Sequence, residues 1–130
     1  MSRQFLVDTD ILIDFLRGRP VAVSFVNEHL DRIIVSAISV AELYSGVRGR
    51  ANDTERQDLA AFLDLVPIVP VSAGIAEAGG LYRRDYGRSH GVGLADAVIA
   101  ATADSSDAAL KTLNIKHYPM FTGLEPAYRK

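Results

Sequence analysis

The stretch FLVDTD (residues 5–10) decides the fold of this chain. Its three apolar residues predict a short buried strand, and the segment that follows, ILIDFL (residues 11–16), has the apolar spacing of a helix. Asp8 therefore stands where a strand passes into a helix, at the sheet edge where open α/β proteins bind ligands. Asp10 is expected to cap the helix, whereas Asp8 ends a buried run and needs a cation, a proton or a metal.

The composition predicts one cytoplasmic domain that covers residues 1–130. The chain has no cysteine, which excludes disulfides and Cys-based zinc sites, and no apolar run approaches the length of a membrane span. A formal net charge of −2 argues against binding nucleic acid through a basic surface alone, but not against an enzyme that uses a divalent metal. The 48% hydrophobic content favours a buried partner surface, in a homodimer or with another chain.

Short apolar strands and helices alternate along the rest of the chain. Further strands are expected at residues 32–35, 68–71 and 109–113, and further helices at 20–30, 39–49, 54–65, 72–89 and 94–103. This alternation predicts an α/β fold with a parallel sheet that is covered by helices on both faces. Pro70 interrupts the third strand, so that strand is expected to lie near an edge of the sheet or to end early.

Two more carboxylates stand out after Asp8. Asp96 is the one charge in the apolar segment 94–103, and no cation lies three or four residues away from it along a helix. An alternative is that Asp96 caps a helix that starts at Ala97. Glu42 follows the second strand and is expected at the same sheet edge as Asp8, although its spacing from Ser39 also fits a capping box without further function.

Asn114 follows the fourth strand and is expected at that edge too, either as a metal or water ligand or as an ordinary turn residue. Three acids that converge at one edge cannot all stay ionised without a cation. Because the candidate ligands are oxygens, Mg²⁺ or Mn²⁺ is the expected ion.

Four motifs in this order resemble the PIN-domain family, specifically the VapC-type ribonuclease toxins of type II toxin–antitoxin systems. They are LVDTDILI (residues 6–13), ISVAEL (38–43) with Gly46, GLADAVIAATA (93–103) and TLNIKHY (112–118). The resemblance implies a three-layer α/β/α domain with a mostly parallel central sheet. It also implies an acidic pocket of Asp8, Glu42 and Asp96, with Asn114 at a fourth position that the family fills with Asp or Asn.

The activity implied by the resemblance is metal-dependent hydrolysis of RNA by an endoribonuclease. Asp8 and Asp96 would bind Mg²⁺ or Mn²⁺ directly, while Glu42 and Asn114 would hold its waters or a second ion. The metal would lower the pKa of a bound water and offset charge on the phosphate. The implied substrate is transfer RNA or ribosomal RNA, and the implied partners are a second copy of the chain and a VapB-like antitoxin whose C-terminal segment enters the active site.

Several basic side chains are candidates for steering the RNA backbone, although any one of them is also typical of a solvated surface. They are Arg83, Arg84, Arg88, Lys111 and Lys116. His90 and His117 are interpreted as loop residues, because a metal-bound hydroxide removes the need for a general base. Thr9 is expected to form a hydrogen bond within the pocket.

Two other functions also fit parts of the sequence. The sequence from Asp8 to Asp10 also resembles the nucleophile motif of haloacid dehalogenase-type phosphatases, but those enzymes need a longer chain, a downstream lysine and an acidic pair. The other rival is a non-catalytic PIN-like domain that binds RNA or serves as a scaffold. In such a domain the acids would be eroded, and the three that remain here favour catalysis.

Overall fold

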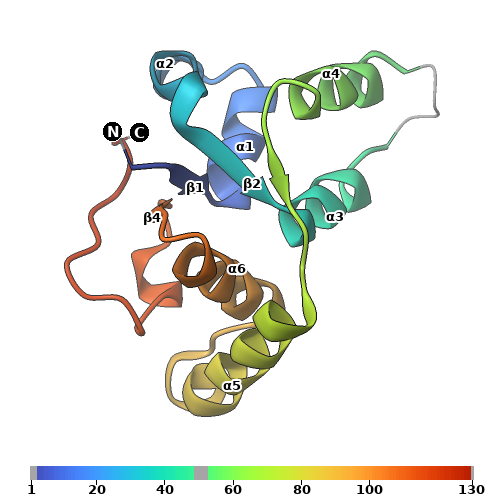
Figure 1. Cartoon of the computed structure of the whole chain (residues 1–130). Helices are drawn as coiled ribbons and strands as arrows, with labels where there is room; N and C mark the ends of the chain where they lie inside the picture. Colours follow the sequence, from blue (N-terminus) through green and yellow to red (C-terminus); the bar gives the residue numbers. More distant parts are fainter. Residues whose placement is uncertain (1–2, 49–52, 130) are drawn as a thin grey trace.

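A four-stranded parallel sheet forms the centre of the computed structural model, which describes residues 3–48 and 53–129 (Figure 1). Its strands are β1 (Phe5–Val7), β2 (Ile33–Ser36), β3 (Ile68–Val69) and β4 (Ala109–Lys111). Their order is β3-β2-β1-β4, and every neighbouring pair is parallel. The predicted α/β class is confirmed, and so is the edge position of the strand that precedes Pro70.

Helices connect the strands and cover both faces of the sheet. They are α1 (Thr9–Leu16), α2 (Pro20–His29), α3 (Ala37–Ser45), α4 (Thr54–Leu63), α5 (Ala73–His90) and α6 (Leu94–Ser105), with single 3₁₀ turns η1 (Leu30–Arg32) and η2 (Ile115–His117). Within the described part of the chain, no helix combines the length and the apolar character needed to cross a membrane.

The third helix starts two residues before its predicted position and ends at Ser45. The Ser36 hydroxyl accepts the Ile38 N–H at 3.2 Å, so Ser36 is the N-cap and the helix begins at Ala37. Residue 49, the last residue of the predicted helix, lies outside the described residues. Because of this earlier start, Ser39 lies inside the helix and is not its N-cap.

The sheet is the middle of three layers (Figure 1). Helices α1, α2 and α4 lie on one face, where Phe5 and Val7 point into an apolar core. Helices α5 and α6 lie on the other face, where Leu6 packs against Ile99 and Leu110. Side chains of one short strand are therefore buried on both sides, as a parallel sheet between helices requires.

The strand order places a topological switch point at β1. Strands β1, β2 and β3 follow one another outward, and the chain then returns to put β4 on the other side of β1. Ligands bind at such a switch point, beyond the carboxyl ends of the strands. Asp8 follows β1 there, its N–H donates to the Lys111 carbonyl at 2.9 Å, and Thr112 follows β4.

Candidate active site

Asp8 is buried at this switch point, with 4% of its surface exposed. Its Oδ1 accepts the Thr9 N–H at 2.8 Å, and its Oδ2 accepts the Thr112 hydroxyl at 2.7 Å. Asp8 is thus the N-cap of α1, and the expectation that Asp10 takes this role was wrong. The helix begins one residue after Asp8, whose extended backbone (φ −69°, ψ 156°) is typical of a cap.

Asp10 lies in the first turn of α1 and joins this helix to the segment after β4. Its Oδ1 accepts the Ile11 N–H at 2.8 Å, and its Oδ2 accepts the Leu113 N–H at 3.0 Å. Burial, followed by the negative charge of Asp8, raises the pKa of Asp10 to about 6. Negative charge is therefore concentrated at a site that is partly removed from water.

Glu42 reaches the same place from α3. The Thr9 hydroxyl donates to Glu42 Oε1 at 2.7 Å and lies 2.9 Å from the Ser39 hydroxyl oxygen. The predicted hydrogen bond of Thr9 within the pocket is confirmed. The capping-box alternative is wrong, because α3 starts at Ala37 and Ser39 already lies inside the helix, where its hydroxyl meets Thr9.

Asp96 is the third residue of α6, whose N-cap is Gly93, so Asp96 does not cap this helix. Its Oδ2 lies 3.2 Å from His117 Nδ1, and its Oδ1 accepts the Tyr118 hydroxyl at 3.4 Å. Burial raises the pKa of the Asp96 carboxyl, and the negative charges of Asp8 and Glu42 raise it further against the opposing effect of His117. Asp96 thus lies within electrostatic reach of the other two predicted acids.

Three contributors to the site were missed by the reasoning from sequence: Thr112, His117 and Tyr118. Thr112 is fully buried and could have been found, because it is the polar residue that directly follows β4 at the edge marked by Asp8. His117 and Tyr118 reach Asp96 through the turn η2, whose path no local spacing reveals. His117 was interpreted as a loop residue only.

Asn114 is exposed, and its backbone forms the turn that leads to η2. Its N–H donates to the Thr112 hydroxyl oxygen at 3.0 Å, and its carbonyl accepts the His117 N–H at 3.0 Å. These bonds fit the turn role that was left open for Asn114. They also hold the residue directly beside the Thr112 hydroxyl that binds Asp8.

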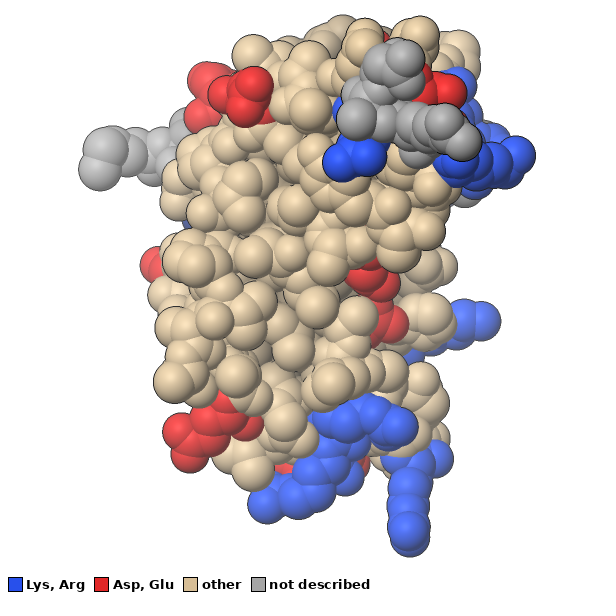
Figure 2. All heavy atoms as spheres, turned by 90° about the vertical axis from the view of Figure 1, so that its right-hand side faces the viewer, with Lys and Arg blue, Asp and Glu red and all other residues tan. Residues whose placement is uncertain are grey.

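The basic candidates occupy different surroundings. Arg83 and Arg84 are exposed on α5, where Arg84 Nε pairs with Asp85 at 2.8 Å, and Lys116 is exposed on η2 beside His117. Lys111 faces the Phe5 ring, whose centre lies 4.4 Å from the Lys111 Nζ. Figure 2, which views the molecule from the side of α3, shows most Lys and Arg side chains toward the two ends of this face, with a largely uncharged area between them that includes some Asp or Glu atoms.

The donor atoms around Asp8 suit a hard divalent cation. Within residues 3–48 and 53–129, no three His, Asp or Glu side chains lie close enough together to hold an ion by themselves. Mg²⁺ does not require such a cage, because it keeps several waters and binds through one or two carboxylates. Asp8 and Asp96 fit that role, and Glu42 fits the role of a ligand to a bound water.

Residues 5–118 match the PIN domain family. The chain belongs to this family. Two proteins of Mycobacterium tuberculosis named Ribonuclease VapC19 and Ribonuclease VapC10 are each 40% identical to it. The VapC19 match covers 95% of this chain and 98% of the relative, and the VapC10 match covers 95% and 92%. A solved toxin-antitoxin complex from Klebsiella pneumoniae is 29% identical over 98% of this chain and all of that one, with a TM-score of 0.80. The predicted PIN-like α/β fold is confirmed.

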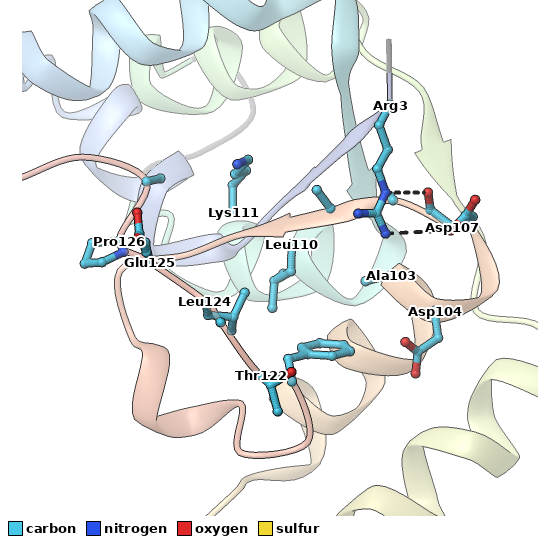
Figure 3. A pocket seen from close by; sticks show the side chains of 15 residues that line it. Arg3, Ala103, Asp104, Asp107, Leu110, Lys111, Thr122, Leu124, Glu125 and Pro126 are labelled. Carbon is cyan, nitrogen blue, oxygen red and sulfur yellow. Dashed lines mark hydrogen bonds and ion pairs between the residues drawn. The ribbon is translucent and has the colours of Figure 1, made fainter. Parts of the chain in front are cut away.

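Two cavities of about 550 Å³ each open near the sheet of this PIN domain. The first lies along the free edge of β4, where the Arg3–Asp107 ion pair borders it, and it includes none of the predicted acids (Figure 3). The second lies between α1, α3 and α4 and reaches Glu42. Its walls combine apolar and charged side chains: Ile13, Leu16, Leu43, Val47, Leu59, Arg17, Arg48, Glu55 and Asp58.

Proposed function

We propose that this PIN-domain protein is a VapC-type toxin, an endoribonuclease that hydrolyses RNA phosphodiester bonds with the help of Mg²⁺ or Mn²⁺. The observation that carries the proposal is the gathering of Asp8, Glu42 and Asp96 at the switch point of the sheet. Their mutual repulsion and partial burial would be relieved by a cation. The names of the 40% identical relatives support the same activity.

Each residue of the site has a task in this mechanism. When bound, the divalent ion would lower the pKa of a water molecule and offset the charge that develops on the phosphate. Asp8 and Asp96 would bind the ion, and Thr112 keeps the Asp8 carboxylate oriented. Thr9 orients Glu42, which would accept a hydrogen bond from a metal-bound water. Asn114 would hold a second water at the exposed rim.

The proposed substrate is structured RNA, of the transfer or ribosomal class. Without a cation the acids would repel a phosphate, so substrate binding and metal binding should depend on each other. Arg83, Arg84 and Lys116 are proposed to contact the RNA backbone, and of these Lys116 is exposed on the turn that carries His117. Lys111 is proposed to contribute less, because its ammonium faces the Phe5 ring.

The proposed protein partners are a VapB-like antitoxin and a second copy of the chain. The cavity between α1, α3 and α4 is suited to an antitoxin segment, because several apolar side chains line it and it leads to Glu42. A basic antitoxin side chain at that end would meet the acids and displace RNA. Exposed Leu65, Leu81 and Leu94 provide apolar surface that suits contact between copies.

The test is RNA cleavage by the purified chain, free of any partner. Total RNA is incubated with the wild type in Mg²⁺, in Mn²⁺ and in EDTA, and Asp96→Asn controls for contaminating nuclease. The proposal predicts cleavage that needs metal and is absent from the variant. Equal cleavage by both proteins, together with no calorimetric binding of Mn²⁺ to the wild type, would contradict it and favour a non-catalytic scaffold.

A further inference from the structure

Tyr118 places a hydroxyl group beside Asp96, one of the three predicted acids. The residue is 1% exposed, although its hydroxyl end reaches the polar site. The hydroxyl donates to Asp96 Oδ1 at 3.4 Å. Burial, followed by the negative charges of Asp8 and Asp96, raises the pKa of this hydroxyl, so it stays protonated and remains a donor. Asp96 comes from α6 and Asp8 from the end of β1, so the orientation of Asp96 decides how the two carboxylates face each other.

The ring of Tyr118 is firmly held. It packs in the core between the sheet and α6, together with Leu6, Ile34 and Ile99, and it stacks on Phe121 with ring centres 6.5 Å apart. Its backbone N–H donates to the Ile115 carbonyl at 3.0 Å, which closes η2. A ring fixed in this way fixes the position of its hydroxyl oxygen as well.

We propose that Tyr118 is a positioning residue for the metal site: its hydroxyl holds the Asp96 carboxylate in the orientation relative to Asp8 that a divalent cation needs. The inference rests on the proposed function, because it assigns a role toward the same ion. Hydrogen bonds from a second layer of residues orient metal ligands, and their loss typically weakens metal binding about 10- to 100-fold.

Asp8 and Asp96 each have partners other than Tyr118, so loss of the Tyr118 hydroxyl should not unfold the chain. Asp8 also accepts hydrogen bonds from Thr9 and Thr112, and Asp96 also pairs with His117. Replacement of Tyr118 by phenylalanine keeps the ring in the core and leaves each carboxylate with a partner. The expected change is therefore in the orientation of the carboxylates and not in the fold.

The experiment is calorimetric titration of Mn²⁺ into the full chain at neutral pH, for the wild type, Tyr118→Phe and Tyr128→Phe. The last variant is a matched control, since the Tyr128 hydroxyl donates at 2.8 Å to Asp14, a buried carboxylate at the other end of α1. We expect Tyr118→Phe to bind Mn²⁺ about tenfold more weakly, and Tyr128→Phe to bind it as the wild type does.

A second readout is the Mn²⁺ concentration that gives half-maximal RNA cleavage. It should rise about tenfold in Tyr118→Phe, whereas the rate at saturating Mn²⁺ should change much less. Mn²⁺ binding by Tyr118→Phe that equals or exceeds that of the wild type would overturn the inference while leaving the proposed function intact. Absence of Mn²⁺ binding by the wild type would overturn both.

Discussion

A carboxylate is buried at each end of α1, and the two carboxylates have different kinds of partner. Asp8 and Asp14 are both 4% exposed. Asp14 lies 3.3 Å from Arg19 and accepts the Tyr128 hydroxyl at 2.8 Å, so its charge is balanced. Asp8 accepts hydrogen bonds from uncharged groups, and no ion pair within residues 3–48 and 53–129 includes it.

The difference shows that burial of an acid does not by itself mark a functional site. A balanced pair such as Asp14 with Arg19 contributes to the fold. At the other end, Asp10, Glu42 and Asp96 add further negative charge around Asp8, which opposes folding of the metal-free chain. A cation that bound the folded state at this end would stabilise it, by an amount that grows with the logarithm of the ratio of its concentration to its dissociation constant.

The largest expected effect is on catalysis at the Asp8 end. Asp8→Asn should reduce metal-dependent RNA cleavage by about a thousandfold, or roughly 4 kcal/mol, because an amide removes the charge that holds the ion. The measurement is the initial rate of cleavage in Mg²⁺, with Asp14→Asn as the matched control. If the Asp8→Asn enzyme kept more than about a tenth of the wild-type rate, Asp8 would not have the proposed role in holding the ion.

The next effect is on stability at the Asp14 end. Asp14→Asn should lower the free energy of unfolding by about 2 kcal/mol, because the Arg19 pair is lost while Arg19 itself stays partly in water. Urea denaturation in EDTA measures this change, and calorimetry should show that Mn²⁺ affinity is retained. A weakened affinity for Mn²⁺ would mean that the two ends are coupled through the helix.

The third prediction concerns pH. The pKa of Asp10 rises from 3.8 to about 6 in the folded chain. Between these values the folded state binds more protons than the unfolded state, so the free energy of unfolding should fall as pH rises from about 4 to about 6. The loss should be about 2 kcal/mol after allowance for partial exposure, and the raised pKa of Asp96 acts in the same direction.

Urea denaturation in EDTA across this pH range tests the sign of the effect. Asp10→Asn should flatten the dependence on pH, since the substituted side chain no longer titrates. Stability that increases over the same range would contradict the charge imbalance at the Asp8 end.

The smallest expected effect separates two lysines. Lys116→Ala should weaken RNA binding about threefold, because this exposed side chain lies next to His117 at the acidic end. Lys111→Ala should change RNA binding less, because the Lys111 ammonium faces the Phe5 ring. Filter binding with Asp96→Asn as the background measures both, and a larger loss from Lys111→Ala would reverse the assignment.

Much of the fold follows from local pattern. The apolar run before Asp8 and the helical stripe after it specify β1 and α1, and alternation along the chain predicts the parallel sheet. The acids were found because each one interrupts an apolar segment or follows a strand. The caps were harder to predict, because a shift of two residues in the start of a helix moves the cap of α1 from Asp10 to Asp8 and removes the capping box of Ser39 and Glu42.

The remaining part of the site depends on contacts between distant segments. Thr112 meets Asp8 across 104 positions of sequence, and Tyr118 meets Asp96 across 22. Neither contact leaves a periodic signal in one sequence, because it depends on the placement of β4 beside β1 and on the path of η2. The chemistry could be predicted from residue types, whereas the groups that orient the acids could be identified only from the structure.

The central claim is that a cation belongs at the Asp8 end of α1, and its most direct test is the effect of Mg²⁺ on thermal unfolding at neutral pH. Saturating Mg²⁺ should raise the unfolding temperature of the wild type by about 5 to 10 °C. Asp14→Asn should unfold at a lower temperature yet show the same rise, and Asp8→Asn should show almost none. A rise in Asp8→Asn equal to that of the wild type, or no rise in the wild type, would contradict the account.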